Sequence, residues 1–217
     1  MKETIIVAVP GHVSSRHASV LRDIHDPEVN IAVWERTPAI PSSELDGVLD
    51  LLHEEVRVHG CTTAIMRHLR SAFMTLGLEA PVLLDDVAWL LEEFARTARA
   101  TDLRFLLSAV TTNMCRRFHT DMNEMRLLCT YRGPGTLWLP NDAVNEHAIR
   151  SQNPELPIER SPADILQVAT GHVAIIKGAL YPGTHMGACV HRSPTIEEAG
   201  ERRLLLRVDP NVPLFGS

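Results

Sequence analysis

The segment Phe118-His119-Thr120-Asp121 places an imidazole and a carboxylate one residue apart. Alternate residues of a β-strand point to the same face, so His119 and Asp121 can hold one ion between them when this segment is extended. His191 comes 72 residues after His119, at the end of an apolar strand-like run, and can supply a second imidazole from another strand. Two imidazoles and a carboxylate on one side of a metal leave the other side open, as oxygen-activating non-haem Fe(II) enzymes require. His119, Asp121 and His191 are therefore the predicted metal ligands and catalytic centre.

Three arginines offer a binding function for an anion beside this centre. Arg202 opens the last strand-like segment with Arg203 beside it, and Arg126 begins an earlier one. A guanidinium grips a carboxylate in fork geometry, so an arginine here could hold the far end of a dicarboxylate co-substrate. A one-residue change of register swaps which of Arg202 and Arg203 points inward, and the sequence leaves that choice open.

Residues 1–100 have mainly helical periodicity. Helical stretches are expected after Ser43, from about Thr62 to Leu76 with Gly77 as the stop, and from about Asp85. One short strand is expected at residues 30–35, where apolar and polar residues alternate. This part of the chain is predicted to form a helical layer.

In residues 101–217 the apolar residues follow a pattern typical of strands. Short strand-like segments at residues 104–110, 114–119, 126–131 and 202–208 are separated by Gly- and Pro-containing turns, which favours a small barrel or jelly roll. The predicted fold class is α+β. The whole chain, 1–217, is expected to form a single domain, with the helical N-terminal layer (1–100) packed against the barrel core (101–217).

The order of H-x-D, a glycine-led apolar strand, a histidine and an arginine resembles the Fe(II)/2-oxoglutarate-dependent dioxygenases. Their core is a double-stranded β-helix, a jelly-roll or cupin-like barrel. The residues that carry the resemblance are FHTD, GHVAIIKG, VHRSP and GERRLLLR, between about Phe118 and Asp209.

This resemblance implies a role for each candidate residue. It implies that His119, Asp121 and His191 bind Fe(II), and that Arg202, with Arg203 as the close alternative, anchors 2-oxoglutarate. Arg126 could help to bind an anion. The implied reaction is hydroxylation of a substrate C–H bond, and the sequence does not specify whether that substrate is a small molecule or a peptide.

A closer resemblance is to a bacterial family catalogued as domain of unknown function number 1826. From Asn30 onward, the chain contains blocks similar to its signature: NIAVWERT, FHTDMNEMRLLCTYRGPGTLWLPNDAVN, QVATGHVAIIKG and VHRSP. This second resemblance implies no established activity.

Other interpretations of the same residues stay open. Asp121 could cap the turn that follows it, a common role for aspartate. Cys189 shares the face of His191 and could draw Zn(II) into the site, although core filling is the simpler reading. The alternative functions are a non-catalytic zinc-binding or metal-homeostasis protein on the same barrel, and a fold relative that binds a small anion without metal.

Composition and charge argue against several other classes of protein. Apolar residues make up 45% and charged residues 22% of the 217, which is typical of a globular protein and excludes a polar disordered chain. No apolar run is long enough to span a bilayer, and the N-terminal apolar run is too short for a signal peptide, so a cytoplasmic location is expected. A net charge of −6 argues against non-specific nucleic-acid binding. The four cysteines form no C-x-x-C pair and are expected to be reduced and buried, and oligomeric state is not specified.

Overall fold

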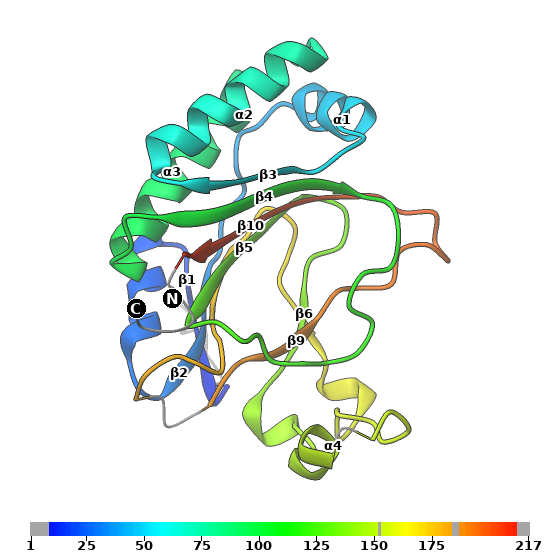
Figure 1. Cartoon of the computed structure of the whole chain (residues 1–217). Helices are drawn as coiled ribbons and strands as arrows, with labels where there is room; N and C mark the ends of the chain where they lie inside the picture. Colours follow the sequence, from blue (N-terminus) through cyan, green and yellow to red (C-terminus); the bar gives the residue numbers. More distant parts are fainter. Residues whose placement is uncertain (1–8, 152, 184–186, 212–217) are drawn as a thin grey trace, which may run out of the picture.

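The computed structural model describes residues 9–151, 153–183 and 187–211 and has a mixed α+β architecture (Figure 1). Its largest element is a seven-stranded sheet with the order β1-β2-β8-β5-β10-β4-β3. A smaller sheet, β7-β6-β9, packs against one face of the large sheet through a shared apolar cluster. The strands are β1 Gly11–Ser15, β2 Val29–Trp34, β3 Val56–Gly60, β4 Leu103–Val110, β5 Met125–Arg132, β6 Leu137–Leu139, β7 Leu166–Gln167, β8 Val173–Lys177, β9 Val190–Arg192 and β10 Arg203–Pro210.

Strand β10 lies between β4 and β5 and organises the large sheet. It pairs antiparallel with β4 along its whole length, from Arg203 opposite Val110 to Pro210 opposite Leu103. It also pairs antiparallel with β5, with a register shift between Leu204 and Leu205. The only parallel pair among the described strands is β1 with β2.

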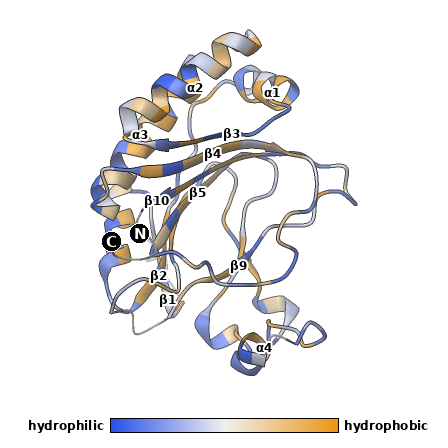
Figure 2. Cartoon of the chain, in the orientation of Figure 1, coloured by the Kyte–Doolittle hydropathy of each residue, from blue (hydrophilic) through white to orange (hydrophobic). Residues whose placement is uncertain are grey.

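Helices α1, α2 and α3 lie along the outer face of the large sheet (Figure 1). Figure 2 shows that they carry both hydrophobic and hydrophilic residues, as expected for helices with one buried side. Helix α2 confirms the predicted helix and ends at Gly77, whose φ of 66° suits a glycine. The bounds are η1 Ala18–His25, α1 Ser42–Leu51, α2 Thr62–Leu76, α3 Pro81–Ala98, η2 Asn141–Ala143, α4 Glu146–Ser151 and η3 Pro162–Asp164.

The two faces of β10 have opposite chemistry. Leu204, Leu206 and Val208 belong to the large core beneath the helices. Because side chains alternate along a strand, the residues between them face the interior that the smaller sheet covers. Those residues include two arginines and an aspartate: Arg203, Leu205, Arg207 and Asp209.

The N-terminal half contributes more strands than its periodicity predicts. The strand expected at residues 30–35 is confirmed as β2, but β1 and β3 also join the large sheet. Helix α3 begins at Pro81, four residues before the expected start, because a proline is well suited to the first turn of a helix.

The predicted strand at residues 114–119 is wrong over most of its length. Only His119 pairs there, in an isolated bridge. The side chain of Arg117 instead donates to the carbonyl oxygens of Asn153 and Pro154, and Arg116 pairs with Glu197.

Two further sequence-based expectations concern exposure. Cys129 and Cys189 are buried as predicted, whereas Cys61 and Cys115 are exposed. Within the described part of the chain, no helix is both long and apolar enough to cross a bilayer.

Candidate metal centre

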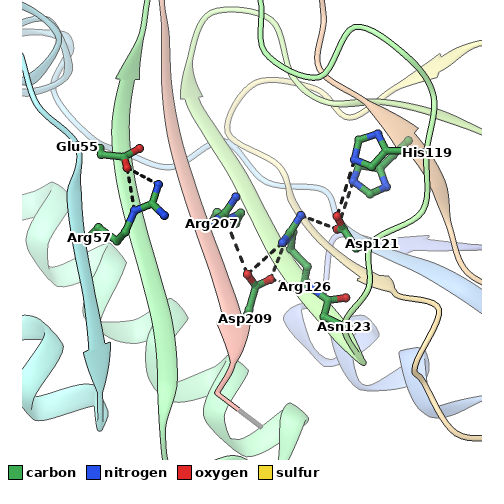
Figure 3. Close-up of polar contacts among 9 residues, drawn as sticks. Glu55, Arg57, His119, Asp121, Asn123, Arg126, Arg207 and Asp209 are labelled. Atoms are coloured by element: carbon green, nitrogen blue, oxygen red, sulfur yellow. Dashed lines mark hydrogen bonds and ion pairs between the residues drawn. The ribbon is translucent and has the colours of Figure 1, made fainter. Parts of the chain in front are cut away.

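His119, Asp121 and His191 come together beside the start of β5, where Figure 3 shows Asp121 between His119 and Arg126. His191 lies in β9, and His119 pairs with it antiparallel, with N–H···O distances of 3.0 Å in both directions. Directly paired residues point to the same side, so the two imidazole rings are adjacent, with centroids 4.7 Å apart. Among the described residues, these three form the group of potential ligands whose donor atoms lie within 4.8 Å of one another.

Asp121 completes the set by directing its carboxylate at both rings. Its Oδ1 lies 3.8 Å from Nε2 of His119, and its Oδ2 lies 3.4 Å from Nε2 of His191. The side chain therefore points to the imidazoles and not to the turn that follows it (Figure 3). This orientation favours the ligand interpretation over the turn-cap interpretation.

The backbone sets the tautomer of both histidines. Nδ1 of His119 lies 3.0 Å from the carbonyl oxygen of Arg117, and Nδ1 of His191 lies 3.1 Å from that of Cys189. A carbonyl oxygen can only accept, so Nδ1 carries the proton in each neutral ring and Nε2 keeps its lone pair. Metal-binding histidines are commonly oriented in this way by the second ring nitrogen.

Burial differs between the two histidines. His191 is 5% exposed, and its burial lowers the pKa of the imidazole to about 4, so the ring is neutral at pH 7, as metal binding requires. The side chain of His119 is 35% exposed. The centre is thus closed on the His191 side and open to solvent at His119.

Arg126 connects Asp121 to β10. Its NH1 lies 2.5 Å from Oδ2 of Asp121, while its Nε and NH2 donate to the two carboxylate oxygens of Asp209 at 2.6 and 3.1 Å. Asn123 also donates to Asp209, at 3.0 Å. Burial opposes the charge of Arg126, but Asp209 and Asp121 together raise its pKa. The structure therefore gives Arg126, a predicted anion-binding residue, two carboxylates of the protein itself.

The adjacent Arg202 and Arg203 have opposite environments. Arg202 lies on the outer surface, where it pairs with Asp50 at 2.7 Å and its side chain is 40% exposed. Arg203 is 1% exposed and donates from NH2 to Oγ1 of Thr130 at 3.1 Å. Its buried Nε has no hydrogen-bond partner, and burial lowers its pKa to about 10. Of the two, Arg203 is the arginine that faces the interior.

Three further residues of a type that can bind metal are Cys189, His12 and His185. Cys189 is fully buried in the interior apolar cluster, and burial raises the pKa of its thiol, which keeps it protonated. His12 contacts Trp138, with ring centroids 5.0 Å apart. His185 lies outside the described residues.

Sequence reasoning missed Asp209 and Arg207. Both lie on the inner face of β10 and contact each other at 3.7 Å, and Asp209 holds Arg126. The alternation of Arg203, Arg207 and Asp209 with Leu204, Leu206 and Val208 is the signal that could have found them.

Comparison with known proteins adds a family and a fold. Residues 15–209 match the family described as "Protein of unknown function (DUF1826)". The chain belongs to that family. No curated protein matches this chain.

Solved structures provide the fold of this DUF1826 protein. It is similar to dioxygenase for auxin oxidation 1 from Arabidopsis thaliana in its 2-oxoglutarate complex, with a TM-score of 0.54, 11% identity and coverage of 95% of this chain and 94% of that one. A protein from Shewanella oneidensis described as an oxygenase gives a TM-score of 0.43, 12% identity and coverage of 91% and 88%. A prolyl-4-hydroxylase from Pseudomonas putida gives a TM-score of 0.36 and 11% identity, with coverage of 76% of this chain and 97% of that one. The first of these likenesses shows that the two proteins share a fold.

Proposed function

We propose that this DUF1826 protein is a mononuclear non-haem Fe(II) oxygenase that uses 2-oxoglutarate to hydroxylate a substrate. The observation that carries the proposal is the donor set: two histidines with free Nε2 atoms and one carboxylate, all directed at one point. Three ligands on one side of a metal leave positions for a co-substrate and dioxygen. A structural zinc site more often has four protein ligands, and Cys189 is not part of this group.

The strand arrangement supports a double-stranded β-helix. Strands β4, β10, β5 and β8 are antiparallel neighbours within the seven-stranded sheet, and β7-β6-β9 with the His119 bridge form the facing sheet. The fold shared with the auxin dioxygenase agrees with this interpretation. In this arrangement His191 comes from β9 of the smaller sheet, His119 from the bridge beside it and Asp121 from the loop after that bridge, while Arg203 comes from the larger sheet.

Arg203 fits the far carboxylate of 2-oxoglutarate. It is a buried cation on the inner face of β10, its Nε is unpartnered, and no described carboxylate pairs with it. An uncompensated buried charge is costly, and a bound carboxylate would remove that cost. Arg202 does not fit this role, because it lies outside the barrel with Asp50.

The chemistry that Fe(II) and 2-oxoglutarate supply balances as follows: 2-oxoglutarate, O₂ and a substrate C–H give succinate, CO₂ and C–OH, with one oxygen atom entering succinate and the other the hydroxyl. The chain's own residues hold and orient these reactants. His119, Asp121 and His191 would hold the metal, and Arg126 fixes the Asp121 carboxylate by binding its Oδ2. The apolar cluster around Trp138 and Leu205 keeps water from the interior.

The test is an anaerobic titration of the metal-free protein with Fe(II) and then 2-oxoglutarate, followed by the visible metal-to-ligand charge-transfer band. We expect the band in the wild type, its loss in His191→Ala, and a requirement for at least 100-fold more 2-oxoglutarate in Arg203→Met. Arg202→Met is the matched control and should titrate like the wild type. Metal binding without the band in the wild type would overturn the 2-oxoglutarate assignment, and tight binding of Zn(II) alone would favour a zinc-binding protein.

A further inference from the structure

A cleft of about 440 Å³ opens next to the candidate metal centre. Met122 and Asn123, which line it, directly follow the ligand Asp121 in the chain. Its other polar walls come from the inner face of the large sheet: Arg57, His59, Arg104, Arg126, Arg207 and Asp209. The cleft therefore lies directly beside the candidate metal ligand Asp121, and its volume suits a small organic molecule.

Strand register explains why so many cations line this cleft. Arg57 of β3 stands opposite Leu106 of β4, which stands opposite Arg207 of β10. In the next inward-facing row, His59 stands opposite Arg104, and Arg104 opposite Asp209. Side chains in these rows share the face on which Arg126 meets Asp121, and Figure 3 shows Arg57, Arg207 and Arg126 in succession toward the metal ligands.

The acidic groups of the protein leave several of these cations unsatisfied. Asp209 is occupied by Arg126 and Asn123 at 2.6 and 3.0 Å, and Arg207 reaches it only at 3.7 Å. Arg104 has no ion pair among the described residues. Arg57 pairs with Glu55, but both side chains are substantially exposed, so an anion could replace Glu55 at little cost.

Arg207 is the least exposed of Arg57, Arg104 and Arg207, and its ion pair with Asp209 is long, at 3.7 Å. Its pKa is lowered by burial and further by neighbouring Arg126. A bound anion would relieve both effects, because it adds hydrogen-bond acceptors and opposite charge at the same place.

We propose that this arginine cleft, formed by Arg57, Arg104 and Arg207, binds the anionic group of the substrate, a carboxylate or phosphate carried by a small organic molecule. The inference rests on the proposed oxygenase function and names its substrate class. The anion at the cleft would place the rest of the molecule past Met122, toward the open side of the metal centre. Met122 is 70% exposed and offers an apolar contact for that part.

The cleft is separate from the site proposed for 2-oxoglutarate. Arg203 and Arg207 lie on the same face of β10 but four residues apart, which corresponds to about 13 Å along a strand. Arg203 is buried, whereas the side chain of Arg207 is 32% exposed. Two anion sites on one strand would thus serve two different molecules.

The experiment uses the full, metal-free chain, so it does not depend on iron or turnover. Benzoate, phenyl phosphate and neutral benzyl alcohol are titrated into ¹⁵N-labelled protein, and the arginine side-chain Nε–Hε signals are followed by NMR. We expect saturable shifts with at least one of the two anions and none with benzyl alcohol, and the anion that binds more tightly identifies carboxylate or phosphate.

Variants show whether the cleft itself is the site. Arg104→Gln, which removes an exposed side chain with no ion pair among the described residues, should weaken anion binding about tenfold, and Arg104→Gln/Arg207→Gln should abolish it. Arg67→Gln, at an exposed position of helix α2, is the matched control and should bind like the wild type. Equal binding by Arg104→Gln and the wild type, or no saturable shift with either anion, would overturn the proposal.

The charge-transfer titration separates this proposal from the oxygenase function. Anion binding without the 2-oxoglutarate band would leave the cleft assignment standing and remove the oxygenase assignment. The 2-oxoglutarate band without anion binding would support the oxygenase assignment and overturn the cleft assignment. Loss of the band in Arg104→Gln/Arg207→Gln but not in Arg203→Met would make the cleft the co-substrate site and so contradict the proposal.

Discussion

The two faces of β10 divide the molecule into a part that supports the fold and a part suited to chemistry. On the outer face, Leu204, Leu206 and Val208 are fully buried against the helical layer. On the inner face of the same strand, Arg203 is buried without a carboxylate partner in the described chain, and Asp209 orients Arg126. Outer-face residues gain stability from burial, whereas on the inner face Asp209 and Arg126 compensate each other and the buried charge of Arg203 lacks a carboxylate partner among the described residues.

The largest effect is expected at the metal ligands. His191→Asn should lower metal affinity by about a thousandfold or more, because it removes one of three ligands, while secondary structure stays unchanged. Metal content after dialysis against Co(II) or Fe(II) measures this directly. Wild-type protein should also gain thermal stability on metal addition, through linkage of binding to folding, and the variant should not. Unchanged metal content would show that His191 is not a ligand.

The outer face should respond in stability alone. Leu206→Ala is expected to lower the free energy of unfolding by about 3 kcal/mol, because it leaves a cavity between the sheet and the helices. Urea denaturation measures the loss. Metal affinity under native conditions should stay within a factor of two or so of the wild type, and a large loss there would show that the two faces are not independent.

Asp209, which holds Arg126 beside the ligand Asp121, should have an intermediate effect on metal affinity. Asp209→Asn removes a charged partner of Arg126 and with it the support of Asp121, so metal affinity should fall about 10- to 100-fold. A competition titration with a chelator measures it. Asp50→Asn, which removes the surface partner of Arg202, is the control and should leave metal affinity unchanged.

A substitution on the inner face should raise the free energy of unfolding, where most substitutions lower it. Arg203→Met replaces a buried guanidinium with an apolar chain, so the ligand-free protein should become more stable by about 1–2 kcal/mol, since burial lowers the Arg203 pKa to about 10. Chemical denaturation without 2-oxoglutarate tests the sign. A clear destabilisation would mean that the Thr130 contact, and not ligand binding, accounts for the arginine.

The smallest effect is expected on the surface. Arg202→Met breaks an exposed ion pair with Asp50, and such pairs contribute about 0–1 kcal/mol. High salt should weaken the pair and reduce the difference between variant and wild type. A loss comparable to that in Leu206→Ala would show that Arg202 belongs to the folded framework.

The triad and helix α2 could be predicted from local signals. The residue types of the H-x-D motif and of the later histidine grouped His119, Asp121 and His191, and the structure brings them together although Asp121 lies in no strand. Apolar periodicity with Gly77 identified both ends of α2. These features depend on near neighbours in the chain or on chemistry that few residues can perform.

Features that depend on long-range pairing could not be predicted. The positions of β1 and β3 in the sheet are set by partners far along the chain, and the segment before His119 makes loop contacts through Arg116 and Arg117 in place of a strand ladder. The choice between Arg202 and Arg203 depends on the local register of β10, which shifts against β5 just after Leu204. Only the folded arrangement shows which arginine faces inward.

The most direct measurement is a crystal structure grown anaerobically with Mn(II) as a stand-in for Fe(II) and with 2-oxoglutarate, using the anomalous signal to locate the metal. The predicted result is one metal bound to Nε2 of His119, Nε2 of His191 and the carboxylate of Asp121, with the far carboxylate of 2-oxoglutarate on Arg203. A metal at any other position, or a 2-oxoglutarate carboxylate held by Arg104 and Arg207, would contradict the account.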